Sequence, residues 1–200
     1  MICAIRYVNA AAKGDANAQY MMGMCMLRDP SISKSHAEQA VQLLLKSAQQ
    51  ENQWGYYGIG LVYSKSTFRS IQEPHVNQAV MCYKSSVKQG NAYSAYELGL
   101  AYEEGLEGIL TKKTDLNQRR ADILYQLAAN QGHTKAIEKL NSPEYIQRNR
   151  GIIKGSKEYY RVDLILEPEL TVTDEILRSI DVSGDTGREL KHRLTMSRIV

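Results

Sequence analysis

The chain has 200 residues, and its hydrophobic content of 43% is that of a protein with a folded core, which excludes general disorder. The net charge of +3 is too small to indicate nucleic acid as a partner. No apolar run reaches the roughly 20 residues that span a bilayer, and the N-terminus lacks the form of a secretory signal, so we expect a cytoplasmic protein.

From residue 14 onward the chain repeats one sequence frame. Its copies start at Gly14, Glu51, Gly90 and, in shortened form, Gly132, at distances of 37, 39 and 42 residues. A period of this length is typical of two-helix units that stack and bury a shared core. Residues 1–13 carry the spacing of a second helix without its first helix. They are either a terminal cap, which we favour, or part of a longer array.

Each copy is predicted to contain a first helix, a loop and a second helix. The first helices follow Asp or Asn residues that can cap a helix N-terminus, and the loops contain Pro30, Pro74 and the pair Gly105 and Gly108. In chain order, we expect helices over residues 15–27, 37–50, 52–64, 76–89, 91–104 and 116–130, followed by one that ends before Pro143.

The second helices share one face of small and large residues. Counted back from the start of the next copy, the eleventh residue is alanine and the seventh is leucine or tyrosine: Ala40, Ala79 and Ala121, with Leu44, Tyr83 and Tyr125. A spacing of four places each pair on the same side of its helix. We therefore expect the alanines to let neighbouring helices approach closely, and the larger residues to fill the space between them.

Residues 143–200 lie outside the repeat, which gives two predicted parts, 1–142 and 143–200. The alternating pattern over residues 159–172 predicts a strand or a hairpin, and short helices are expected over 173–180 and 188–198. This segment either folds over the end of the last repeat, which we favour, or offers a strand edge to another protein.

The repeats resemble the Sel-like repeat family, a branch of the tetratricopeptide-type α-solenoids. The third copy carries most of the family's motif: Gly90, Gly99, Tyr102, Gly105, Gly108, Ala121, Tyr125, Ala128, Ala129, Gln131 and Gly132. The resemblance covers residues 4–141. It implies a mainly α fold, an α/α solenoid of about three and a half helix-turn-helix repeats, to which residues 143–200 would add a small α+β extension.

The same resemblance implies a binding function. Members of the family mostly act as adaptors that hold other proteins, and some are immunity proteins that block a bacterial toxin. We therefore expect a scaffold whose partner is a protein or peptide. A different hypothesis is a structural or regulatory subunit that self-associates through the ends of the solenoid.

In the tetratricopeptide-type arrangement, the first helices line a concave groove. Transfer of that register gives partner-binding candidates at three, six, ten and thirteen residues after the repeat starts: Asn17, Tyr20, Met24, Trp54, Tyr57, Leu61, Tyr93, Tyr96, Leu100, Glu103 and Lys135. Trp and Tyr on such a face supply much of the energy of protein interfaces. The alternative is that these rings pack between neighbouring repeats.

No motif in the sequence indicates an enzyme, a cofactor or a metal site. The three cysteines are too widely spaced for a disulfide framework or a zinc site, and we expect free thiols on apolar helix faces: Cys3, Cys25 and Cys82. The four histidines have no second ligand at helical spacing: His36, His75, His133 and His192. Asp185-Thr186-Gly187 matches the tripeptide of aspartic proteases, but it occurs once and is predicted to be a turn.

Overall fold

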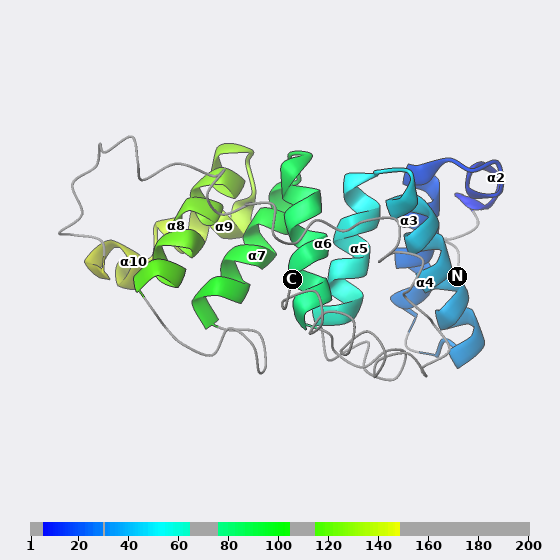
Figure 1. Ribbon diagram of the computed structural model, residues 1–200, viewed down its shortest axis with the longest axis horizontal. Helices are drawn as coiled ribbons and strands as arrows, with labels where there is room; N and C mark the ends of the chain where they lie inside the picture. Colours follow the sequence, from blue (N-terminus) through cyan, green and yellow to red (C-terminus); the bar gives the residue numbers. More distant parts are fainter. Residues whose placement is uncertain (1–5, 30, 65–75, 105–114, 149–200) are drawn as a thin grey trace, which may run out of the picture. The chain divides into compact units, whose positions relative to one another are not determined.

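The computed structural model describes residues 6–29, 31–64, 76–104 and 115–148, and every regular element in these ranges is an α-helix (Figure 1). They form two compact units that divide inside α6, after Ala79. We call the part with α2 to α5 unit 1 and the part with α7 to α10 unit 2. The helices are α2 (Val8–Ala12), α3 (Ala16–Leu27), α4 (Lys34–Gln49), α5 (Gln53–Ser64), α6 (Val76–Lys88), α7 (Ala92–Glu104), α8 (Asp115–Asn130), α9 (Thr134–Leu140) and α10 (Pro143–Arg148).

The six full-length helices predicted from the repeat frame are confirmed. The largest difference is at α4, which begins at Lys34 rather than at residue 37. Ser33 caps this helix, since its Oγ accepts a hydrogen bond from the backbone N–H of His36 at 3.4 Å. The strand and the two helices predicted over residues 159–172, 173–180 and 188–198 lie outside the described residues.

Each repeat starts with a residue in the left-handed backbone conformation. Three of the four are glycines, with φ of 92° at Gly14, 88° at Gly90 and 81° at Gly132. The fourth is Glu51, with φ of 56°. A Cβ atom at any of the three glycines would meet no heavy atom within 4 Å, so backbone conformation and not space accounts for glycine there.

The residue after each repeat start caps the following helix. Asp15 Oδ1 accepts from the N–H of Ala18 at 2.7 Å, Asn52 Oδ1 from that of Trp54 at 2.8 Å, and Asn91 Oδ1 from that of Ser94 at 2.9 Å. In the fourth copy the cap is an imidazole, because His133 Nδ1 accepts from the N–H of Ala136 at 3.2 Å. An aspartate, two asparagines and a histidine thus fix the starts of the four first helices.

In unit 1, α4 packs against both α3 and α5. Its fully buried Leu44 contacts two glycines, one on each neighbour. A Cβ at Gly23 would lie 3.1 Å from Leu44 Cγ, and one at Gly58 would lie 2.8 Å from Leu44 Cδ2. The glycines therefore leave the room that one leucine fills between two helices, and Ala40, also fully buried, keeps the helix backbones close as the sequence predicts.

In unit 2, α7 and α8 form the main helix pair. The buried ring of Tyr125 lies on Gly99, where a Cβ atom would come within 2.6 Å of Tyr125 Cε1. Ala121 on the same helix is fully buried, as the repeat frame predicts, and Ala128 is fully buried as well. The tyrosine thus takes the place in this unit that Leu44 has in unit 1.

The cysteines differ from one another. Cys82 is a free and buried thiol, as expected, and burial raises its pKa to about 12, so it is inert at neutral pH. Cys25 is disulfide-bonded. The expectation of three free thiols is therefore wrong for Cys25, because sequence spacing says nothing about which cysteines the fold brings together.

Candidate protein-binding surface

Three aromatic rings meet on the first helices of unit 1. The Trp54 ring centroid lies 5.6 Å from that of Tyr20 on α3 and 6.1 Å from that of Tyr57 on its own helix, α5. Trp54 and Tyr57 are partly exposed, whereas Tyr20 is buried. We call these three residues the unit 1 aromatic cluster. It has an apolar body and a partly accessible rim, a combination common at protein interfaces.

The other predicted contact residues of unit 1 differ in exposure. Asn17 is exposed, and its Oδ1 accepts a hydrogen bond from Nδ2 of the helix cap Asn52 at 2.8 Å. Leu61 is partly exposed. Met24 is buried in the core, so neither it nor Tyr20 offers appreciable surface to a partner in this conformation. The surface predicted for unit 1 therefore narrows to Asn17, Trp54, Tyr57 and Leu61.

The equivalent helices of unit 2 carry a second group of rings. Tyr93 is 49% exposed and meets the His133 ring edge-on at 4.8 Å, while Tyr96 stacks on the same ring at 4.7 Å. We call Tyr93, Tyr96 and His133 the unit 2 aromatic cluster. Lys135, two residues after His133, is exposed, and Leu100 is partly exposed on α7. The structure thus brings together the predicted residues Tyr93 and Tyr96 through a histidine that the sequence did not single out.

His133 has two roles in this cluster: its ring packs between the tyrosines, and its Nδ1 caps α9. Burial lowers the pKa of its imidazole below the usual 6.5; Glu97 opposes this shift, and Lys135 adds to it. The neutral ring is also the form in which Nδ1 can accept the capping hydrogen bond. The capping hydrogen bond and the lowered pKa of His133 therefore both favour the neutral imidazole.

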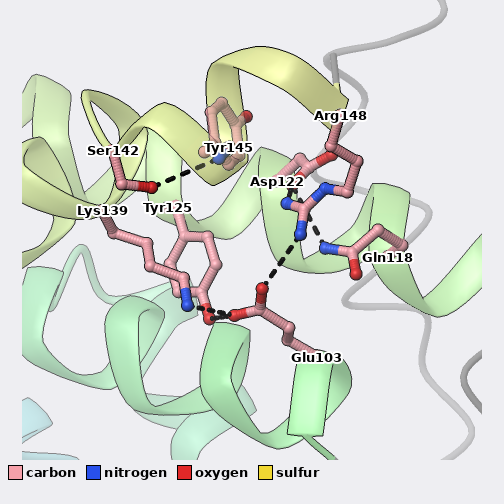
Figure 2. A network of polar contacts seen from close by, with 8 residues as sticks. All are labelled: Glu103, Gln118, Asp122, Tyr125, Lys139, Ser142, Tyr145 and Arg148. Carbon is pink, nitrogen blue, oxygen red and sulfur yellow. Dashed lines mark hydrogen bonds and ion pairs between the residues drawn. The ribbon is translucent and has the colours of Figure 1, made fainter.

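Glu103 is the remaining predicted contact residue, and it belongs to a network of polar contacts in unit 2 (Figure 2). Its carboxylate accepts from the Tyr125 hydroxyl at 2.7 Å and pairs with Lys139 Nζ at 2.8 Å and with Arg148 Nη1 at 3.1 Å. The other guanidinium nitrogen, Arg148 Nη2, lies 2.9 Å from Asp122 Oδ1. Glu103 is thus engaged by groups of its own chain.

The Gln118 amide borders this network. In the orientation drawn in Figure 2, its Nε2 lies 3.4 Å from Asp122 Oδ1. Turning the amide by half a rotation places its oxygen 2.9 Å from Arg148 Nη2. We prefer the second orientation, because it gives the guanidinium a shorter and charge-assisted hydrogen bond.

The two carboxylates that share Arg148 have pKa values shifted in opposite directions. Burial opposes ionisation of Glu103, but the hydrogen bonds from Lys139, Tyr125 and Arg148 outweigh it and lower the pKa of Glu103. Burial is also the largest influence on Asp122, and there the attraction of Arg148 offsets it only in part, so the pKa of Asp122 is raised. Glu103 has three donors and Asp122 has fewer, which accounts for the difference.

The sequence reasoning missed His133 as a cap, and it missed Asp122, Lys139 and Arg148 altogether. A signal for His133 was present, since it follows Gly132 at the position where the other copies have Asp15, Asn52 and Asn91. Arg148 had no comparable signal, because it lies after the last repeat and its partner Glu103 is 45 residues away.

A separate hollow of about 450 Å³ lies in unit 1 between α2, α3 and α4. Its lining includes Val8, Ala11, Met22, Leu43 and Lys46, and none of the predicted contact residues. Within the described ranges, no helix is long and apolar enough to cross a bilayer. No group of three or more His, Cys, Asp or Glu side chains in that part of the chain is arranged to hold a metal ion.

Comparisons with known proteins agree with the helical repeat. A family model described as the Sel1 repeat matches residues 16–52 in unit 1 and 92–133 in unit 2. Among solved structures, the chain is similar to a Sel1 repeat protein from Oxalobacter formigenes, with 25% sequence identity and a TM-score of 0.58. The alignment covers 80% of this chain and 61% of that one, so it spans less than two thirds of the relative's length. A comparison with curated proteins found no match.

Proposed function

Because the chain is a Sel1 repeat protein, we propose that it binds a partner protein or peptide through the exposed rings of its first helices. Sel1 repeat proteins are generally protein-interaction scaffolds and typically not catalysts. The observation that carries the proposal is the exposure of Tyr93, at 49%, at the repeat position that Trp54 occupies in unit 1. Large, partly exposed aromatic side chains are frequent energetic centres of interfaces.

The polar groups around the rings support a peptide or protein as the ligand. Asn17 is exposed beside the unit 1 aromatic cluster, and Lys135 beside the unit 2 aromatic cluster. Rings surrounded by hydrogen-bonding side chains give a surface with an apolar centre and a polar rim. Such a surface recognises partners by shape and hydrogen bonding, and it does not require a cofactor.

The test is capture of partners from a lysate of the native host, followed by an affinity measurement with a double variant. Trp54→Ala combined with Tyr93→Ala is expected to weaken binding of the captured partner by at least about 100-fold, since two interface anchors are removed. Val8→Ala combined with Ile137→Ala is the matched control, because it also removes one exposed apolar side chain from each unit, each 40% exposed. Circular dichroism establishes that both proteins stay folded.

Three outcomes would refute the proposal: equal binding by both double variants, loss of the helical signal in the first variant, or no partner together with a defined oligomer. The third outcome would favour self-association, which size-exclusion chromatography with light scattering detects directly. If a single stoichiometric partner is found, its own activity distinguishes an adaptor from an immunity protein.

A further inference from the structure

Helix α10 is attached to unit 2 almost without apolar burial. None of its residues is buried, and its one aliphatic side chain, Ile146, is 49% exposed. Its charged end makes the closest contacts to α7 and α8, because the Arg148 guanidinium bridges Glu103 and Asp122 at 3.1 and 2.9 Å. The same guanidinium lies 5.0 Å from the ring centroid of Tyr145, which orients it within the helix. The guanidinium of Arg148 thus ties α10 to both α7 and α8, in addition to the contacts that α10 makes with α9.

The receiving surface, by contrast, is built into the unit. Glu103 lies in the last turn of α7, and Asp122 lies one position beyond the fully buried Ala121 of α8. With Arg148 in place, their side chains are only 13% and 7% exposed. Carboxylates so far removed from water are costly to leave without a positive partner. Of the cations that pair with these carboxylates among the described residues, withdrawal of Arg148 would leave the ammonium of Lys139, which pairs with Glu103 and not with Asp122.

The arrangement matches a guanidinium better than an ammonium. Two carboxylates on different helices accept from two different nitrogens of one planar group, and the Gln118 amide oxygen can accept from the same group at 2.9 Å. A lysine offers a single nitrogen and cannot span both acceptors in this way. The site therefore has the chemistry of an arginine receptor, filled here by the chain's own α10.

We propose that α10 is a displaceable occupant of this arginine receptor, and that an arginine-bearing segment of the partner protein takes the place of Arg148. The proposal rests on the proposed function, because it gives the bound partner a basic segment that reaches the end of α7. Displacement exchanges one guanidinium for another, so no buried carboxylate is left unpaired in the bound state. Release of α10 is then a consequence of partner binding.

The test uses the full-length protein and a peptide with the sequence of residues 142–148, blocked at both ends and labelled for fluorescence anisotropy. The peptide is expected to bind the Arg148→Ala protein at least 10-fold more tightly than the wild type, whose receptor is already filled. Adding Glu103→Gln and Asp122→Asn to the Arg148→Ala protein is expected to abolish binding. The same peptide with Arg148→Gln is the control and is expected not to bind.

Equal affinity for the wild type and the Arg148→Ala protein would overturn the proposal, as would binding of the control peptide. If the Arg148→Ala protein does not fold, hydrogen exchange on the wild type decides. Salt screens ion pairs near the surface, so raising NaCl to about 1 M is expected to speed exchange in α10 several-fold while leaving the slow amides of α8 unchanged. Unchanged protection of α10 would show that it is not displaceable.

This result can be separated from a failure of the proposed function. The peptide site uses neither aromatic anchor, so the Arg148→Ala protein carrying Trp54→Ala and Tyr93→Ala is expected to keep its affinity for the peptide. If the peptide binds but the captured partner is indifferent to the two aromatic substitutions, the arginine receptor is correct and the aromatic surface is wrong. If the partner depends on the rings but the peptide does not bind, the aromatic surface is correct and the arginine receptor is wrong.

Discussion

Glu51 and Gly90 occupy the same position in successive repeats, and both have a left-handed backbone, with φ of 56° and 88°. Only glycine adopts this conformation without steric cost, whereas another residue loses about 1–2 kcal/mol. Glu51 therefore adds backbone strain at a position that glycine occupies in the other three repeats.

Glu51→Gly is expected to raise the free energy of unfolding by about 0.5–1 kcal/mol, because relief of the left-handed strain exceeds the entropy that glycine loses on folding. The reciprocal change, Gly90→Ala, is expected to lower it by about 1 kcal/mol. A new Cβ at Gly90 meets no atom within 4 Å, so packing does not complicate that comparison. Urea denaturation at constant m-value measures both. A destabilised Glu51→Gly protein would contradict this account of the repeat start.

Gly55→Ala is expected to be among the most damaging single changes in unit 1, at a cost of about 3 kcal/mol. Its Cβ would lie 2.4 Å from the backbone nitrogen of Ala48 and 2.6 Å from the carbonyl carbon of Ser47, and neither atom can move without shifting α4. Gly99→Ala is the matched comparison, since its Cβ would meet the Tyr125 ring at 2.6 Å, a side chain that can tilt. Thermal unfolding of the two variants should rank Gly55→Ala as the less stable. The opposite order would mean that α5 can withdraw from α4 at low cost.

The two carboxylates on Arg148 should respond to acid in opposite senses. The pKa of Glu103 is lowered in the folded state, so its contribution to stability is present above the usual 4.5 and is lost as the pH falls through the lowered value. The pKa of Asp122 is raised, so its ionised form is disfavoured in the folded state, and this penalty is relieved as the pH falls through the raised value toward 3.8.

Urea midpoints measured between about pH 3 and pH 6 for Glu103→Gln and Asp122→Asn separate these contributions. The stability difference between the wild type and Glu103→Gln should shrink with falling pH. Relative to Asp122→Asn, the wild type should gain stability over the same range. Differences that change in the same direction for both variants would contradict the assignment of opposite shifts.

His133 should make unit 2 less stable in mild acid. Its pKa is lowered in the folded state, so the unfolded chain takes up the proton first, and stability falls as the pH drops below 6.5 until the folded pKa is passed. His133→Asn should remove this dependence while keeping a helix cap, because Asn52 and Asn91 fill the same role in the second and third repeats. If the His133→Asn protein keeps the same dependence of stability on pH, a group other than His133 causes it.

Much of the fold could be predicted because the repeat frame is locally encoded. Ala40, Leu44 and Tyr125 were placed in the core by spacing alone, and the caps Asp15, Asn52 and Asn91 follow from residue type and position. These features depend on contacts within one repeat or between adjacent ones. A periodic sequence repeats such contacts, which makes the inference strong.

The binding surface was less predictable, for a physical reason. The register places Tyr20 and Trp54 on equivalent helix faces, but it does not say what covers a face, and Tyr20 proves to be buried beside the Trp54 ring. Glu103 was predicted as an open contact residue and is instead engaged by Lys139 and Arg148. Arg148 lies after the last repeat and has no periodic counterpart, so sequence spacing could not reveal its contact.

The unit 1 aromatic cluster also contains an intrinsic fluorescence probe. Trp54 is the chain's single tryptophan, and its ring lies against Tyr20 and Tyr57, while the rings of unit 2 are tyrosine and histidine. Indole emission therefore reports on the surroundings of α3 and α5, whereas far-ultraviolet dichroism sums over all helices. If the two signals melt at different temperatures, the two halves of the repeat array unfold as separate cooperative blocks, and superimposable curves would mean a single one.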